Sequence, residues 1–305
     1  MAGKYDIAVI GGGIAGFTAA QHALEGGGSV VHIVGGEPIG GLVCNIGALN
    51  GYAAGNQPLS GIELALGLSE ANATRGGQMI PANVNTLSQD TAGFHIATPE
   101  GDFAARQVIA ATGARLRMLD VPGARELAGR GVSQCAWCDG ALYKGREVVV
   151  IGGGDAALEE AHHLAQFAAK ITVITHGDGF RARQHYVDRL AELDTIDFRW
   201  MSDVTQIIGT DMVEAVRVES KEDKTTEIIA CSGAFVFIGL EPNSASLQGL
   251  VRLNAEGGVL TNDAMATDTP GLYAVGAVRS GYKGRLVHAV GEAATAAMDA
   301  ISRCE

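Results

Sequence analysis

The stretch that decides the fold is Ile7-Ala8-Val9-Ile10-Gly11-Gly12-Gly13-Ile14-Ala15-Gly16, near the start of the chain. Its apolar run predicts a buried strand, and the Gly-x-Gly-x-x-Gly spacing predicts a tight turn into a helix. Glycines at these places let a pyrophosphate approach the backbone, while the helix N-terminus meets its charge. The pattern predicts a dinucleotide-binding loop whose contact residues are Gly11, Gly13, Ile14, Ala15 and Gly16.

The same combination of strand, glycine loop and helix recurs about 140 residues later. Val148-Val149-Val150-Ile151 leads into Gly152-Gly153-Gly154-Asp155-Ala156-Ala157, which has the related Gly-x-Gly-x-x-Ala spacing. Two such units predict an α/β protein with two Rossmann-like dinucleotide-binding domains. We assign Gly152, Gly154, Asp155 and Ala156 to the second nucleotide site.

Between the two loops lies Cys135-Ala136-Trp137-Cys138-Asp139. Two cysteines separated by two residues can close a disulfide within one turn, and one thiol of such a pair usually becomes the attacking thiolate. Asp139 follows directly and can carry a proton to or from the thiols. Half of a zinc site and a pair of buried free thiols are the alternatives. Zinc needs four ligands, and no second pair stands at a useful spacing, so we favour a redox pair and predict no metal site.

Composition limits the classes of function. A chain of 305 residues can form two domains, each with its own core. The net charge of −12 argues against a nucleic-acid surface or an anionic membrane as partner. Glycines interrupt the first apolar run and no later run is long enough to span a bilayer, so we expect neither a signal peptide nor a membrane span. Five cysteines, three of them scattered, indicate a reducing compartment, and we expect a cytoplasmic protein.

The order of predicted elements indicates that one domain is discontinuous. Turn signals mark crossovers around residues 116–121 and 239–243. We therefore expect a first domain of residues 1–116 and 245–305, with residues 117–244 inserted into it. The expected helices cover residues 60–76, 156–167 and 290–301. A β-meander is expected over 79–108, and further strands over 170–174, 197–201, 212–219 and 234–238.

Several single residues carry narrower expectations. Glu37 follows the second strand, near the place where such folds put the carboxylate that holds an adenosine ribose, although it could equally be a solvated acid. Trp137 is expected to shape substrate access or to pack on the other domain. We expect structural or solvated roles for His162 and His163, and a helix-dipole role for Glu159 and Glu160.

The chain resembles the low-molecular-weight bacterial thioredoxin reductases, which are FAD-containing pyridine-nucleotide disulfide oxidoreductases. The motifs that carry the resemblance span almost the whole chain in the family's order; they are residues 11–16, 111–114, 131–140, 152–161 and 269–274. The resemblance implies three-layer ββα domains, FAD in the first domain and a pyridine nucleotide in the second. It also implies a homodimer that reduces a thioredoxin-like protein or a small disulfide.

The resemblance further implies roles for individual residues. Cys138 would lie nearer the flavin, Cys135 would attack the substrate disulfide, and Asp139 would move the proton. The inserted domain would swing about hinges near Leu116 and Glu241. Thr112, Gly113 and Asn50 would lie along the FAD site. Cys44 is expected to be a small buried residue, and the alternative is a free thiol near the flavin.

Three departures from the family put parts of this reading in question. Thr175-His176-Gly177 replaces a His-Arg-Arg run that grips the 2′-phosphate of NADPH, which leaves Arg181 and a titratable His176. The donor is therefore open between NADPH, NADH, ferredoxin and another reductant. Gly276-Ala277 stands in place of Gly-Asp, and Lys283 to His288 in place of a segment with Arg-Gln. Arg285 or His288 could lie at the flavin ring, or the changes could be drift with FAD held by backbone contacts.

Three functions remain open at this level. The first is an FAD-dependent disulfide reductase of the thioredoxin reductase type, which Asp139 favours. The second is a flavin-dependent dithiol oxidase reoxidised by oxygen, which the altered nucleotide site favours. The third is a flavin-binding regulatory protein without turnover, against which the intact cysteine pair argues.

Overall fold

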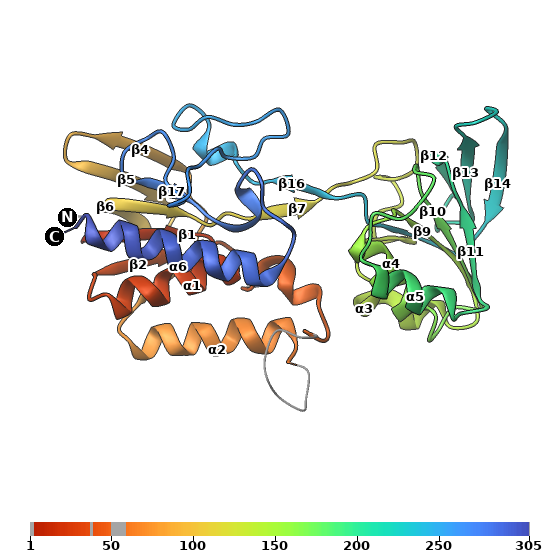
Figure 1. The fold of residues 1–305 in the computed structure, drawn as a ribbon, viewed down its shortest axis with the longest axis horizontal. Helices are drawn as coiled ribbons and strands as arrows, with labels where there is room; N and C mark the ends of the chain where they lie inside the picture. Colours follow the sequence, from red (N-terminus) through yellow and green to blue (C-terminus); the bar gives the residue numbers. More distant parts are fainter. Residues whose placement is uncertain (1–2, 37–38, 50–58, 305) are drawn as a thin grey trace. The chain divides into compact units, whose positions relative to one another are not determined.

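The computed structural model describes residues 3–36, 39–49 and 59–304. The chain forms two compact units, Met1–Arg115 with Glu241–Glu305, and Leu116–Leu240 between them in sequence (Figure 1). The unit boundaries lie near those expected from the turn signals. The predicted fold class, α/β with one Rossmann-like unit inserted into another, is confirmed.

The discontinuous unit is built on a seven-stranded sheet of order β3-β2-β1-β6-β5-β4, with β17 also paired to β6. Strands β1, β2 and β3 run parallel, β17 runs parallel to β6, and β4 to β6 form the expected antiparallel meander. The strands are β1 (Gly3–Ile10), β2 (Val30–Ile33), β3 (Gln78–Ile80), β4 (Thr86–Asp90), β5 (Gly93–Thr98), β6 (Gly101–Ala110) and β17 (Leu272–Ala274). The helices are α1 (Ile14–Glu25), α2 (Gly61–Thr74) and α6 (Leu286–Ser302).

Alternation along β1 divides the core of this unit into two parts. Ile7 and Val9 pack with α1 and α6, whereas Ala8 and Ile10 pack on the opposite face. Figure 1 shows α1 and α6 side by side along the sheet. The buried residues of α6 are all alanines, so the two helices approach closely. This packing holds the start of α1, and with it the first glycine loop, against the end of β1.

The inserted unit has a five-stranded parallel sheet of order β11-β10-β9-β15-β8 and a three-stranded antiparallel sheet of order β12-β13-β14. The strands are β8 (Val132–Ser133), β9 (Glu147–Ile151), β10 (Lys170–Ile174), β11 (Ile196–Arg199), β12 (Ser202–Ile208), β13 (Ala215–Ser220), β14 (Thr226–Ala230) and β15 (Gly233–Val236). The helices are α3 (Ala136–Asp139), α4 (Asp155–Leu164) and α5 (Gln184–Ala191).

Three layers follow from alternation along β9. Val148 and Val150 pack with the helices α4 and α5, whereas Val149 and Ile151 pack with the three-stranded sheet. Figure 1 shows α4 and α5 on one side of the parallel sheet and β12 to β14 on the other. This is the ββα layering that the family resemblance implied.

Some element boundaries differ from the expected ones. Helix α6 begins at Leu286 rather than near residue 290, because Arg285 has extended backbone and serves as its N-cap. Helix α4 ends at Leu164, and the strand expected to run to residue 201 ends at Arg199 because Met201 has a φ of +47°. Helix α5 and the strands β12 and β14 were not predicted from the sequence. In the described part of the chain, no helix is long and apolar enough to cross a membrane.

The two connecting segments pair with each other. Strand β7 (Ala114–Leu116) and strand β16 (Leu240–Pro242) form a two-stranded sheet. The Arg115 guanidinium donates two hydrogen bonds to the Glu241 carboxylate, at 2.5 and 3.1 Å. The segments that enter and leave the inserted unit are therefore held together, at the positions expected for the hinges.

Candidate active site

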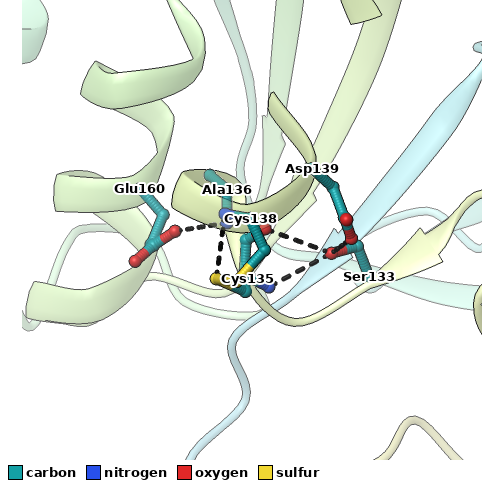
Figure 2. The surroundings of a disulfide bond; sticks show 6 residues. All are labelled: Ser133, Cys135, Ala136, Cys138, Asp139 and Glu160. Atoms are coloured by element: carbon teal, nitrogen blue, oxygen red, sulfur yellow. Dashed lines mark hydrogen bonds between the residues drawn. A yellow bond between two sulfur atoms is a disulfide. The ribbon is translucent and has the colours of Figure 1, made fainter. Parts of the chain in front are cut away.

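The cysteine pair lies at the start of a short helix. Strand β8 ends at Ser133, and Cys135 follows in extended conformation as the N-cap of α3. Cys135 and Cys138 form a disulfide with their Cα atoms 5.3 Å apart (Figure 2). The Cys135 Sγ also accepts a hydrogen bond of 3.1 Å from the backbone N–H of Cys138. The same turn that closes the disulfide therefore offers an N–H donor to the Cys135 sulfur.

The accessibility of the two cysteines runs against the roles expected for them. Cys135 is 8% exposed, whereas Cys138 is exposed. Attack on a protein disulfide needs an accessible sulfur, which favours Cys138. The N–H donor at Cys135 favours a thiolate there. Accessibility and hydrogen bonding thus point to different sulfurs.

Asp139 is held by a residue that the sequence analysis missed. The Ser133 hydroxyl donates a hydrogen bond of 2.6 Å to Asp139 Oδ2 and accepts one of 3.1 Å from the Cys135 N–H. Ser133 therefore links the Asp139 carboxylate to the backbone of the redox turn, as Figure 2 shows. Ser133 stands two residues before Cys135, and nothing in that spacing signalled the contact with Asp139.

Helix α4 contacts the redox turn from the other side. A carboxylate oxygen of Glu160 accepts a hydrogen bond of 2.6 Å from the Ala136 N–H. Burial is the main cause that raises the pKa of Glu160 to about 7. One turn further along, the His163 ring stacks on the Trp137 ring with their centroids 3.8 Å apart. Trp137 thus packs on a helix of its own unit, and Glu160 binds α3 in addition to any effect on the α4 dipole.

The first glycine loop has the geometry that a bound dinucleotide requires. Gly11 has a φ of +126°, and a Cβ there would lie 2.1 Å from the Ala111 carbonyl oxygen. A Cβ at Gly16 would lie 1.8 Å from the Gly11 carbonyl oxygen. Gly13 is the N-cap of α1, and no side chain among the described residues caps that helix. The first-turn N–H groups of Ile14 and Ala15 therefore remain without a side-chain partner, as an anion site needs.

His32 supports this loop from below and was not anticipated. Its Nε2 lies 2.9 Å from the Gly11 carbonyl oxygen, and its ring meets Phe17 edge to face. Because His32 is 1% exposed, burial lowers its pKa from 6.5 to about 4. The ring is therefore neutral at physiological pH, and its Nε2–H donates the hydrogen bond to the Gly11 carbonyl oxygen.

Two further predicted flavin residues lie close to this unit's connecting segment. Thr112 donates a hydrogen bond of 2.8 Å to the Asn243 carbonyl, and the Asn243 amide donates one of 3.0 Å to the Thr112 carbonyl. The Asn243 N–H donates to the Gly113 carbonyl at 2.9 Å. Asn243 thus fixes the turn that follows β6. Nothing in the sequence around Asn243 signalled this role.

Gly276 directly adjoins the first loop. Its φ is +72°, and a Cβ there would lie 3.0 Å from the Ala15 Cβ. The Gly276 N–H donates a hydrogen bond of 2.8 Å to Glu292, which also pairs with Arg279. The half-buried Ala277 follows. The half-buried Glu292–Arg279 pair, which was not predicted from the sequence, therefore holds the segment where the family's Gly-Asp is altered.

The other residues predicted to lie near the flavin have few contacts that bear on this role. Arg285 is exposed and is the N-cap residue of α6. His288 is half-buried, and its buried Nδ1 has no hydrogen-bond partner among the residues that the structure describes. Cys44 is half-buried, its thiol donates to the Ile39 carbonyl at 2.9 Å, and burial raises its pKa. Glu37 and Asn50 lie outside the described residues.

The second glycine loop repeats the backbone of the first. Gly152 has a φ of +140°, and a Cβ there would lie 2.2 Å from the Phe237 carbonyl oxygen. Gly154 is the N-cap of α4, and a Cβ there would meet nothing within 4 Å. Asp155 opens the helix, with the exposed Ala156 after it. The space in front of this helix terminus is therefore clear.

A loop after β10 folds back onto the second glycine loop. The Arg181 N–H donates to the Gly153 carbonyl at 2.9 Å. The Asp155 carboxylate accepts from the Arg183 N–H at 2.8 Å and from its Nε at 2.6 Å. His176 and the Arg181 side chain are exposed on the same loop. Arg183 thus forms an ion pair with Asp155, a contact that was not predicted from the sequence.

Comparison with known proteins identifies the family. Residues 5–300 match the family model described as pyridine nucleotide-disulphide oxidoreductase. This chain belongs to that family. The thioredoxin reductase of Treponema pallidum is 33% identical over 298 residues, which cover 98% of this chain and 96% of that protein. The thioredoxin reductase of Bacillus subtilis is 35% identical over 300 residues, with coverage of 96% and 92%.

A solved structure agrees over nearly the whole chain. The thioredoxin reductase of Lactococcus lactis has a TM-score of 0.94 and 32% identity, and the match covers 98% of this chain and 99% of that one. As a member of this family the chain is a flavoprotein disulfide oxidoreductase with FAD as its cofactor. Within the described ranges, no group of three or more His, Cys, Asp or Glu side chains is placed to hold a metal ion.

The residues of the first unit fit FAD. The loop leaves no room for a side chain at Gly11, Gly12 or Gly16 and presents an uncapped helix terminus to a pyrophosphate. Gly276 borders the same terminus through Ala15. When bound, FAD supplies a two-electron carrier between the donor and the disulfide.

Proposed function

We propose that this flavoprotein reduces the disulfide of a thioredoxin-like protein through Cys135 and Cys138. The observation that carries the proposal is the disulfide between these residues, at the start of a helix and beside Asp139. The relatives named thioredoxin reductase support a small redox protein as the substrate. A small disulfide molecule is the second substrate class that the same chemistry serves.

Cys135, Cys138 and Asp139 would reduce the substrate by thiol–disulfide exchange. Reduction of the disulfide gives one thiolate and one thiol. The thiolate attacks a sulfur of the substrate disulfide, which forms a mixed disulfide and releases a substrate thiolate. The second cysteine then attacks the mixed disulfide, which restores the Cys135–Cys138 bond and releases the reduced substrate. Asp139, held by Ser133, gives and takes the protons of these thiols.

Trapping the mixed disulfide decides which sulfur attacks. Cys135→Ser leaves Cys138 as the only sulfur of the pair, and Cys138→Ser leaves Cys135. Because Cys138 is the exposed sulfur, we expect Cys135→Ser to form the adduct with a thioredoxin that lacks its second cysteine. Adduct formation only by Cys138→Ser would instead support the role implied by the family resemblance.

We propose that a nicotinamide nucleotide is the donor and that the preference for NADPH is weak. The clear helix terminus at Gly154 supports nucleotide binding. Exposed His176 and Arg181 are the side chains of this loop that could meet a 2′-phosphate, in place of the two arginines of the family's His-Arg-Arg run. Charge-assisted hydrogen bonds contribute about 1.5–3 kcal/mol each, so loss of two arginines removes most of the discrimination.

The test is anaerobic stopped-flow bleaching of the flavin near 450 nm. We expect bleaching by NADPH and by NADH at similar rates, followed by turnover with thioredoxin. Bleaching by dithiothreitol but by neither nucleotide would overturn the donor proposal. Oxygen-dependent oxidation of a dithiol without nucleotide would favour the second candidate function, a dithiol oxidase, for which the altered segment at His176 and Gly177 is the supporting observation.

We also propose that the protein is a cytoplasmic homodimer. Ile62 and Leu66 lie one turn apart on α2 and are 50% and 53% exposed, which is the kind of apolar face that a second copy covers. The acidic charge and the scattered free cysteines suit a reducing compartment. Light scattering of the wild type and of Ile62→Glu tests the dimer, and a monomeric wild type would reject it.

A further inference from the structure

Glu160 lies at the same end of α3 as the Cys135 sulfur. The Ala136 N–H donates to Glu160, and the Cys138 N–H donates to the Cys135 Sγ. The two acceptors thus share the first-turn N–H groups of one short helix. Figure 2 shows Glu160 on one side of this turn and Asp139 on the other. Glu160 is therefore a second carboxylate beside the redox pair, held by a different contact.

The surroundings of Glu160 make its charge costly. Its side chain is half-buried between α3 and α4, and burial is the largest cause of its raised pKa. The charge of Glu159 acts in the same direction, whereas the Ala136 and Trp137 N–H groups act against it. The other titratable or charged groups around this face, on α3, the segment after it, α4 and α5, are Cys135, Cys138, Asp139, Tyr143, His162, His163, Arg183, Tyr186 and Arg189.

We propose that Glu160 is a positioning residue for the redox pair, which holds the α3 turn through Ala136 and takes up a proton when the disulfide is reduced. Two electrons from the reduced flavin or from a dithiol break the S–S bond. One sulfur takes a proton and becomes a thiol, and the other remains a thiolate. The Glu160 carboxylate takes a second proton from solvent. The new negative charge of the thiolate is thereby offset by the loss of the one on Glu160.

The physical reason is the repulsion between like charges at one helix end. In the oxidised protein, Glu160 is the only anionic acceptor of the first-turn N–H groups among the described residues. Reduction adds a thiolate beside it, and two anions so close do not both ionise freely. Glu160 and the thiol should therefore titrate as a coupled pair in the reduced protein. Protonated Glu160 would keep the nucleophile ionised at neutral pH.

The experiment measures thiolate reactivity against pH. The full-length, FAD-loaded protein is reduced with dithiothreitol under anaerobic conditions and freed of excess reagent. Iodoacetamide alkylation of Cys135 and Cys138 is then followed by peptide mass spectrometry from pH 5 to 9.5. Glu160→Gln is compared with the wild type and with Glu159→Gln. Glu159 neighbours Glu160 in sequence but hydrogen-bonds Tyr186 on α5, so its variant is the matched control.

We expect two inflections in the wild-type profile and one in Glu160→Gln. The two proteins should react at similar rates at the ends of the range. Between pH 7 and 8.5 Glu160→Gln should react about tenfold faster, as expected when a shift of one pKa unit is removed. Glu159→Gln should keep both inflections. Superimposable profiles for the wild type and Glu160→Gln would overturn the inference.

A second measurement serves if Glu160→Gln does not fold, as judged by circular dichroism and FAD content. The infrared difference spectrum of the wild type, reduced minus oxidised, should gain a protonated-carboxyl band that Asp139→Asn retains. No such band in either protein would overturn the inference. The inference rests on the proposed redox role of the pair, but both readouts use dithiothreitol. Absence of thioredoxin turnover with a normal profile would reject the function and leave the inference intact.

Discussion

The two glycine loops share a backbone and differ in the side chains around it. A Cβ at Gly11 would lie 2.1 Å from the carbonyl oxygen of Ala111, the residue after β6. A Cβ at Gly152 would lie 2.2 Å from the carbonyl oxygen of Phe237, the residue after β15. Each loop ends in a glycine N-cap, and no described side chain caps either helix. The backbone therefore prepares both helix termini for a phosphate in the same way.

The differences lie directly beneath and in front of each loop. The first turn of α1 has no acidic residue, whereas α4 begins with Asp155, which Arg183 neutralises. Beneath the first loop lies His32, and beneath the second lies Thr175, also buried. The comparison teaches that the glycine pattern specifies an anion site, while affinity and pH response depend on neighbours that the pattern does not include.

The largest loss of stability and of FAD is expected when a side chain is placed in the first glycine loop. Gly16→Ala would put a Cβ 1.8 Å from the Gly11 carbonyl oxygen, a backbone clash that cannot relax. We expect a loss of about 3 kcal/mol or more in the stability of this unit and no retained FAD. Absorbance at 450 relative to 280 nm measures the flavin. Gly154→Ala, which meets open space, is the control in the second loop and should keep FAD.

The second prediction concerns the pH dependence of stability, which His32 beneath the first loop should cause and Thr175 beneath the second should not. The unfolded pKa of His32 is 6.5 and its folded pKa is about 4, because burial disfavours the charged ring. Its contribution to stability is therefore complete above pH 6.5 and is lost as the pH falls towards 4, by about 3 kcal/mol in all.

Urea unfolding between pH 7 and 4.5 measures this loss. The variant His32→Phe should lose less stability across that interval than the wild type, because it removes the titrating ring. Thr175→Val, beneath the second loop, should leave the slope unchanged. Equal slopes for wild type and His32→Phe would show that His32 does not set the acid response.

The third prediction concerns two substitutions that place positive charges beside the second loop, where the family's arginines are missing. A Cβ at Gly177 would lie 3.2 Å from the Gly179 carbonyl oxygen, so a side chain fits with a small shift. His176→Arg combined with Gly177→Arg should raise the preference for NADPH over NADH about tenfold per arginine, since each adds a charge-assisted bond to the 2′-phosphate. The ratio of kcat/KM for the two donors is the measurement. No change in that ratio would mean that this loop does not meet the 2′-phosphate.

The smallest effect is expected at Asp155. The Arg183–Asp155 pair is partly exposed, with side chains 42% and 37% exposed, so Arg183→Ala should cost less than about 1 kcal/mol of stability. Nucleotide binding should weaken severalfold, because an unpaired carboxylate then repels the phosphates. Adding Asp155→Asn should restore it. Calorimetric titration with NADP+ gives the affinities, and an undiminished affinity in Arg183→Ala would count against the assigned contact.

The parts of the fold predicted from the sequence are those with local patterns. An apolar run followed by spaced glycines specifies a strand, a turn and a helix within a dozen or so residues. The paired cysteines likewise define the redox turn by spacing alone. Strand β14 was missed because its residues are largely exposed and do not alternate between apolar and polar. Helix α5 was missed because it is only eight residues long, although Tyr186 and Leu190 recur one turn apart on its buried face.

The parts of the site that escaped prediction depend on contacts between distant segments. Asn243 meets Thr112, and Glu292 meets Gly276, across connections that no local pattern records. Glu160 and His163 offered one hint, since residues three apart share a helix face. That spacing places them together but does not say that the face meets the redox turn. The sequence therefore located the cysteines and left their supporting residues unassigned.

Strand β9 contributes side chains to two separate cores. Its alternate side chains serve the helical layer, with the redox turn, on one face and the three-stranded sheet on the other. Substitutions in β12, β13 or β14 change the core on the face of the parallel sheet opposite α4 and α5, to which Val132 of β8 also belongs. The turn between β13 and β14 is a natural place to insert a label or a foreign domain while the chemistry of the cysteine pair is left as it is.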